Sequence, residues 1–306
     1  MALLTRKIKR QIQSVKNTQK ITKAMEMVSA SKMRRSVNAV LSSRPYSSLA
    51  WEVVQDLSKT TDPESHPLLA KRLNVQVQRV GLVLISANRG LCGVFNQQVA
   101  RQALQTARQQ TEVLPNADIE FITLGKKGGV AVAKAGQKIG ADFEKQDTAN
   151  SVEEISSVAS FITAKYLRGE YDKVFLIFTD FINSLRQKPK TIQLLPLTDQ
   201  PSSELGSVGQ NADASVKSDD TEYLFEPSAE DVLEAFLPRL VEIQLYQAIL
   251  ESNASEHSAR MLAMKNASDA ARDLIGDLTL TFNKARQAGI TQEISEISVS
   301  KAAMEG

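Results

Sequence analysis

Apolar residues recur every three or four positions from the start of the chain, which predicts a long amphipathic helix. They are Leu4, Ile8, Ile12, Val15, Ile21, Met25, Val28, Met33, Val37 and Val40. Such spacing draws one narrow apolar stripe along a helix and leaves Lys and Arg on its other faces. Residues 1–44 contain neither Pro nor Gly, so nothing in them interrupts the helix. The stripe needs a partner to cover it.

A second long helical pattern lies near the other end, where residues 239–306 contain no Pro. Ser228 and Asp231 form a weak capping box at its start, and Pro238 predicts a kink in its early part. Because both patterns are longer than a compact domain needs, and neither contains an apolar run of membrane-spanning length, they favour a coiled coil.

The last part of the second pattern has few charges. Residues 282–300 mix small, apolar and amide side chains around the whole helix, which is typical of a helix surrounded by protein, although an ordinary terminal helix docked on its own domain remains an alternative. Gly276 and Gly289 each cost about 1 kcal/mol relative to Ala in a helix. Their presence indicates close packing or tolerated bending.

The middle of the chain changes to runs rich in β-branched and aromatic residues, which alternate with helical patterns. Such alternation predicts a small parallel sheet with right-handed crossovers. The expected strands are 79–87, 118–125, 173–180 and 191–197, and the expected helices are 95–110, 128–135 and 151–167. Residues 198–222 are rich in Ser, Asp, Asn and Gly and predict a mobile loop.

Charge is distributed unevenly along the chain. The 306 residues have a net charge of +2, but residues 1–35 contain ten Lys or Arg and one acid, Glu26. The basic segment fits a surface helix with a solvated face, a shaft helix in acidic surroundings, or an arm that neutralises nucleic-acid phosphates. It contains no aromatic residue to stack on bases, and charge alone does not choose among the three.

Candidate catalytic chemistry is sparse. Cys92 is the single cysteine and His66 and His257 are the two histidines, so an intramolecular disulfide is excluded and a Cys/His metal site is not expected. The loop 88–93 follows the first strand, where phosphate loops occur, but it matches no nucleotide-binding motif. We expect its glycines to allow a tight turn and Cys92 to be a small packed residue. A nucleotide-dependent enzyme that uses this loop is a further hypothesis, beside the shaft helix and the nucleic-acid arm.

Targeting signals are also weak. An apolar segment behind the first charges is missing, which argues against a secretory signal. An organellar transit peptide is disfavoured because the segment is Lys-rich and its pattern continues past residue 40.

Several segments resemble the gamma subunit of F-type ATP synthases. They are SVKNTQKITKAMEMVSASKMRR from Ser14, SANRGLCGVFN from Ser86, ASEHSARMLAMKNASD from Ala254, LTLTFNKARQAGITQEISEIS from Leu278, and Tyr171 to Leu197 with its final QLLPL. Together they cover most of the chain outside the variable loops. One departure is Val94, where that family commonly has a second glycine.

The resemblance implies an α/β fold in which a Rossmann-like domain, residues 75–197, accompanies a long antiparallel coiled coil. The shaft helices would be residues 1–60 and 227–306, with a flexible loop at 198–226. The implied role is the central rotor shaft, which couples ion-driven rotation of the c-ring to ATP synthesis or hydrolysis and helps to regulate ATPase activity and ion flow. Such a subunit is not catalytic and needs no cofactor or metal.

The implied partners are the alpha and beta subunits of the catalytic ring, the epsilon subunit and the membrane c-ring, without nucleic acid or direct membrane insertion. The implied location is peripheral, on the cytoplasmic face of a bacterial inner membrane or on a thylakoid membrane. Positions matching the family's contact and coupling segments are Lys23, Met25, Arg260, Arg286, Gln287, Thr291, Gln292, Glu293 and Glu296. Chloroplast members carry a regulatory cysteine pair near residues 198–222, and Cys92 lies outside that segment.

Overall fold

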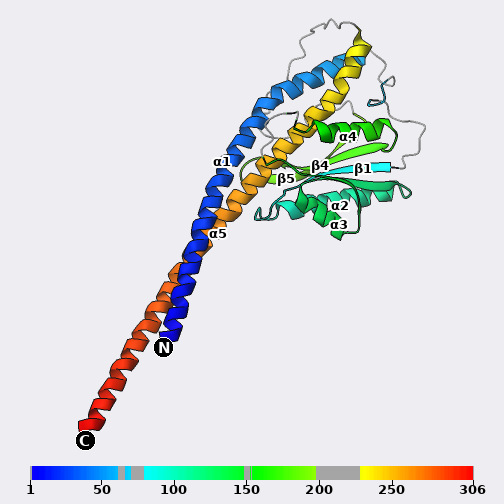
Figure 1. Cartoon of the computed structure of the whole chain (residues 1–306). Helices are drawn as coiled ribbons and strands as arrows, with labels where there is room; N and C mark the ends of the chain where they lie inside the picture. The colour runs from blue at the N-terminus through cyan, green and yellow to red at the C-terminus, as the bar shows by residue number, and fades with distance from the viewer. Residues whose placement is uncertain are drawn as a thin grey trace. The chain divides into compact units, whose positions relative to one another are not determined.

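Along the sequence, one long helix precedes an α/β segment and a second long helix follows it. The computed structural model describes residues 2–60, 66–69, 79–147, 152, 154–197 and 228–305. Helix α1 is Ala2–Thr60 and helix α5 is Ala229–Glu305, as the periodicity predicts (Figure 1). Both contain a proline, Pro45 in α1 and Pro238 in α5. The predicted loop 198–222 lies outside the described residues.

The start of α5 has the predicted cap. The Ser228 hydroxyl accepts the backbone N–H of Asp231 at 3.1 Å and donates to its carboxylate at 2.6 Å. This satisfies one of the amides that a helix start leaves without a partner.

The chain divides into two compact units that cut across both long helices. One unit contains residues 1–29 and 261–306, and the other contains residues 30–260. In the first unit, segments from opposite ends of the chain run antiparallel (Figure 1). The second unit holds the sheet, the shorter helices and the adjoining parts of α1 and α5.

The second unit is built on a five-stranded sheet of order β3-β2-β1-β4-β5. The strands are β1 (Arg79–Ile85), β2 (Asp118–Leu124), β3 (Lys138–Phe143), β4 (Lys173–Phe181) and β5 (Gln187–Leu195). The helices between them are α2 (Phe95–Val113), α3 (Lys126–Lys134) and α4 (Ser156–Leu167). Strands β1 to β4 are parallel, and β5 pairs antiparallel with β4.

Two expectations for the sheet were wrong. Strand β5 is not parallel, because too few residues separate it from β4 for the crossover that a parallel pair needs. Its position at the sheet edge also tolerates Pro189. Strand β3 was not anticipated, since its sequence KIGADF contains Gly and Asp and lacks a continuous apolar run.

The sheet is covered on both faces, which explains why its inner strands are nearly continuous apolar runs. Val83 and Ile85 of β1 belong to a buried cluster with residues of α4 and α5. Leu82 and Leu84 belong to a second cluster with residues of α2 and α3. Figure 1 shows α2 and α3 on one side of the strands and α4 with α5 on the other.

Candidate functional site

The C-terminal part of α5 exposes an apolar face. Ile290, Ile294 and Ile297 are 49%, 58% and 69% exposed. Their spacing of four and three residues places them on one side of the helix. A monomeric protein gains nothing from exposing three isoleucines in a row along a helix, so this face indicates a contact with another protein.

The predicted polar contact positions surround this apolar face. Arg286, Gln287, Thr291, Gln292, Glu293 and Glu296 are all exposed. The amide of Gln292 donates to the Glu296 carboxylate at 2.9 Å, one turn further along. The structure therefore places these six predicted positions on the surface of one helical segment.

The N-terminal part of α1 carries the remaining predicted positions of the same unit. Lys23 is exposed and its ammonium lies 3.0 Å from the Glu26 carboxylate, while Met25 is half-buried. The apolar stripe predicted for this helix is only partly covered, because Ile21 and Val28 are exposed. The basic face and these two apolar side chains are open to a partner.

Arg260 is different from the other predicted positions, because it is nearly buried in the second unit. Its guanidinium donates to the Glu256 carboxylate at 2.7 Å and to the carbonyl of Gly90 at 3.4 Å. A second cation, Lys145, lies 2.5 Å from the other oxygen of Glu256. The guanidinium of Arg260 is therefore engaged by groups of its own chain.

The loop after β1 is held by its own side chains and by neighbouring segments. Asn96 at the start of α2 accepts the N–H of Ala87, and its amide nitrogen lies 3.1 Å from the Cys92 sulfur. Leu91 and Gly93 have φ of 62° and 57°, so the chain turns tightly there, as predicted. Cys92 is 1% exposed and burial raises the pKa of its thiol, as expected for a packed residue.

The first three N–H groups of α3 are already bound within this chain. The N–H groups of Lys126, Lys127 and Gly128 already donate to Asn88 Oδ1, the Ala87 carbonyl and Ser86 Oγ, at 3.4, 3.0 and 2.7 Å. Gly125 precedes them with φ of 101°, and a side chain there would collide with the Ser86 backbone. The start of α3, which follows β2, is thus occupied by this chain's own acceptors.

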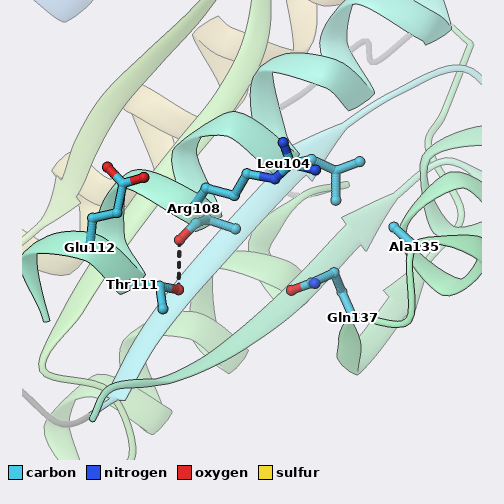
Figure 2. A pocket seen from close by; sticks show the side chains of 7 residues that line it. Leu104, Arg108, Thr111, Glu112, Ala135 and Gln137 are labelled. Carbon is cyan, nitrogen blue, oxygen red and sulfur yellow. Dashed lines mark hydrogen bonds between the residues drawn. The ribbon is translucent and has the colours of Figure 1, made fainter. Parts of the chain in front are cut away.

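A pocket of about 370 Å³ lies between α2 and the turn from α3 to β3 (Figure 2). Its lining residues are Leu104, Ala107, Arg108, Thr111, Glu112, Ala135 and Gln137. The charged side chains Arg108 and Glu112 are exposed, and the Thr111 hydroxyl donates a hydrogen bond to the carbonyl of Ala107. The pocket lacks the buried, converging polar groups of a catalytic site.

Comparisons with known proteins decide between the remaining hypotheses. A family model described as ATP synthase matches residues 4–304. The chain is 43% identical to the ATP synthase gamma chain of Pelotomaculum thermopropionicum over 300 residues, which is 98% of this chain and 99% of that one. It is also 43% identical to the gamma chain of Herpetosiphon aurantiacus over 306 residues, covering 98% of each. The chain belongs to the ATP synthase gamma chain family.

Solved structures agree with the fold of this gamma-family chain. A structure of the Euglena gracilis mitochondrial ATP synthase, titled OSCP/F1/c-ring, matches with a TM-score of 0.64 and 18% identity, covering 99% of this chain and 95% of that one. A Tetrahymena thermophila central stalk/c-ring structure matches with a TM-score of 0.59 and 24% identity, covering 81% and 99%. A gamma chain is the non-catalytic rotor shaft subunit of an F-type ATP synthase, so the nucleic-acid and enzyme hypotheses are set aside.

Two buried side chains of this gamma-family chain, Lys145 and His257, were not predicted from the sequence as interacting residues. Lys145 follows an unpredicted strand, and His257 was considered only as a metal ligand and dismissed. Among the described residues no group of three His, Cys, Asp or Glu could hold a metal ion. The signal that could have found His257 is the dense polar run from Glu251 to Arg260, which directly follows apolar positions of α5.

Proposed function

We propose that this chain couples rotation to catalysis by inserting the C-terminal part of α5 into a ring of alpha and beta subunits. The observation that supports this most directly is the exposed apolar face formed by Ile290, Ile294 and Ile297. A sleeve of other subunits would bury it. Such a shaft contributes no reacting group. It acts by contacting different states of the ring with different free energies, because only such differences shift a conformational equilibrium.

The polar positions around the apolar face would then be the contacts that carry specificity. Arg286, Gln287 and Thr291, with Gln292, Glu293 and Glu296, are exposed and can donate or accept hydrogen bonds from several sides. Lys23 and Met25 on α1 are proposed to face an acidic segment of beta. The ten basic residues within positions 1–35 would attract that segment over several ångströms without fixing one orientation.

The proposed partners at the other end are the epsilon subunit and the c-ring, and the proposed place is peripheral, on the cytoplasmic face of a bacterial inner membrane or on a thylakoid membrane. Among the described residues no helix is long and apolar enough to cross a bilayer. Attachment to the membrane sector would therefore be made through those subunits.

The test is assembly with purified alpha and beta subunits, followed by ATP hydrolysis and torque measurement. We expect the full chain to assemble and support steady hydrolysis, and a chain truncated after Ala285 to give weaker torque. A sharper variant changes Ile290, Ile294 and Ile297 to Ser in the full chain. Its control is Val113→Ser, because Val113 is 73% exposed at the end of α2.

The triple variant should assemble poorly while its secondary structure is unchanged, and the control should behave like the original chain. If no complex forms with the cognate subunits, or if the triple variant assembles and generates torque normally, the proposal is wrong.

A further inference from the structure

One side of α5 contacts the segment after β3 through polar groups. The Asn253 amide donates to the carbonyl of Gln146 at 3.2 Å, Glu256 binds the Lys145 ammonium, and a ring nitrogen of His257 lies 3.0 Å from the carbonyl of Asp147. Positions 253, 256, 257 and 260 lie on one face of a helix. We call these four residues, together with residues 145–147, the polar clamp.

The ion pairs of the polar clamp are withdrawn from solvent. The side chains of Lys145 and Glu256 are 0% and 2% exposed. Burial alone would raise the pKa of Glu256, but Lys145 and Arg260 together hold it below its usual value. Two cations therefore share one carboxylate, and Lys145, Arg260 and Glu256 together carry one net positive charge in a poorly solvated place.

His257 completes the clamp in its neutral form. An arginine can only donate, so Arg260 Nη1, at 3.3 Å, requires a bare Nδ1 on the imidazole. The proton then resides on Nε2 and is donated to the Asp147 carbonyl. Burial lowers the pKa of His257, and the positive charges of Lys145 and Arg260 lower it further.

Other charged groups around the ring are already engaged. The Asp147 carboxylate is 3.0 Å from the Lys32 ammonium of α1. Burial would raise the pKa of Asp147, but Lys32 lowers it. The Cys92 thiol lies near Arg260 and Glu256, and its raised pKa keeps it neutral. A proton added to His257 thus finds no free carboxylate in this cluster.

We propose that His257 is a positioning residue whose protonation opens the polar clamp and so loosens α5 from the segment that follows β3. A protonated ring would point an N–H at the Arg260 guanidinium and add a second positive charge to the cluster. Arg260 would have to leave, so Glu256 would keep only Lys145 and the carbonyl of Gly90 would lose the Arg260 guanidinium. The attachment of the sheet to α5 becomes weaker in acid.

The direction of the pH effect follows from the lowered pKa of His257. The folded form binds the proton less readily than the unfolded form, so the stabilisation is complete above the unfolded value of about 6.5 and is lost as pH falls below it. Each unit of pKa depression changes the opening equilibrium about tenfold.

The first test measures amide hydrogen exchange of residues 144–147 and 253–260 in the full chain at pH 7.5 and 5.5, corrected for intrinsic exchange rates. We expect opening in these segments to increase about tenfold in acid in the original chain. His257→Gln can still accept from Arg260 and donate to Asp147 but cannot be protonated, so it should abolish the increase. His66→Gln changes the other histidine and is the matched control, so it should still show the increase in opening at pH 5.5.

An original chain without the acid response overturns the inference, as does a His257→Gln chain that keeps this response.

The second test rests on the proposed function and measures ion pumping per ATP hydrolysed in the assembled complex. We expect this ratio to fall between pH 7.5 and 5.5 with the original chain and to stay constant with His257→Gln. Failure of the complex to assemble would refute the rotor proposal alone, because the exchange test needs no partner.

Discussion

Two regions of the same helix have similar composition and opposite surroundings. Residues 243–258 of α5 are all buried, although they include Glu251, Asn253, Glu256 and several other polar side chains. Residues 290–301 also mix apolar, small and polar side chains, and all of them are exposed. A helix that presents an apolar face is normally covered along that face. The first region is covered by this chain, so the second indicates cover from other chains.

The two regions also use charge differently. In the buried region each oxygen of Glu256 binds a cation at a fixed distance. In the exposed region the Glu296 carboxylate accepts the neutral amide of Gln292. Buried charges need permanent partners because desolvation is costly, whereas exposed charges can exchange partners as a neighbouring surface moves past. This difference fits a fixed attachment at one end and a sliding contact at the other.

Truncating an apolar side chain to Ala should give the largest difference in stability between the buried region 243–258 and the exposed region 290–301. Leu245→Ala removes a fully buried side chain, so we expect a loss of about 2 to 5 kcal/mol in the free energy of unfolding. Ile297→Ala in the exposed region should change it by less than about 0.5 kcal/mol. Urea unfolding of the full chain, followed by far-UV circular dichroism, measures both. Equal losses would mean that residues 290–301 are already covered within the chain.

Charge removal should give a smaller contrast. Lys145→Met leaves Glu256 with one cation instead of two, and breaking such a buried pair should cost about 3 kcal/mol. Lys284 is an exposed lysine of α5, the helix that carries Ile290, Ile294 and Ile297. Lys284→Met should therefore leave the free energy of unfolding nearly unchanged. The same unfolding measurement applies. A Lys145 variant as stable as the original chain would show that the polar clamp adds no stability.

Thiol chemistry should have the smallest effect. Cys92 is the single cysteine, it is buried, and burial raises the pKa of its thiol. We therefore expect dithiothreitol to leave ATP hydrolysis by the assembled complex unchanged, with Cys92→Ser as the reference chain. A large reversible effect that disappears in Cys92→Ser would contradict this expectation, because Cys92 would then be its source.

Local pattern was enough for much of the fold. The apolar period predicted α1 and α5, the β-branched runs predicted four of the five strands, and the Ser228 cap lies at the predicted position. It was also enough to expect that Cys92 is packed and that the loop 88–93 is a turn. These features depend on neighbours a few residues apart, whose spacing is written in the sequence.

The tertiary structure alone decided which faces are covered. Strand β3 exists because β2 provides an edge for it, and β5 reverses direction because its connection to β4 is short. Gly276 was expected to allow close packing or bending, and no described atom outside the helix lies near the place of a side chain there, which argues against close packing. Lys145 and Glu256 are 111 positions apart, so no local period relates them. Burial turns these two ordinary surface residue types into a clamp, and burial is a property of the folded chain.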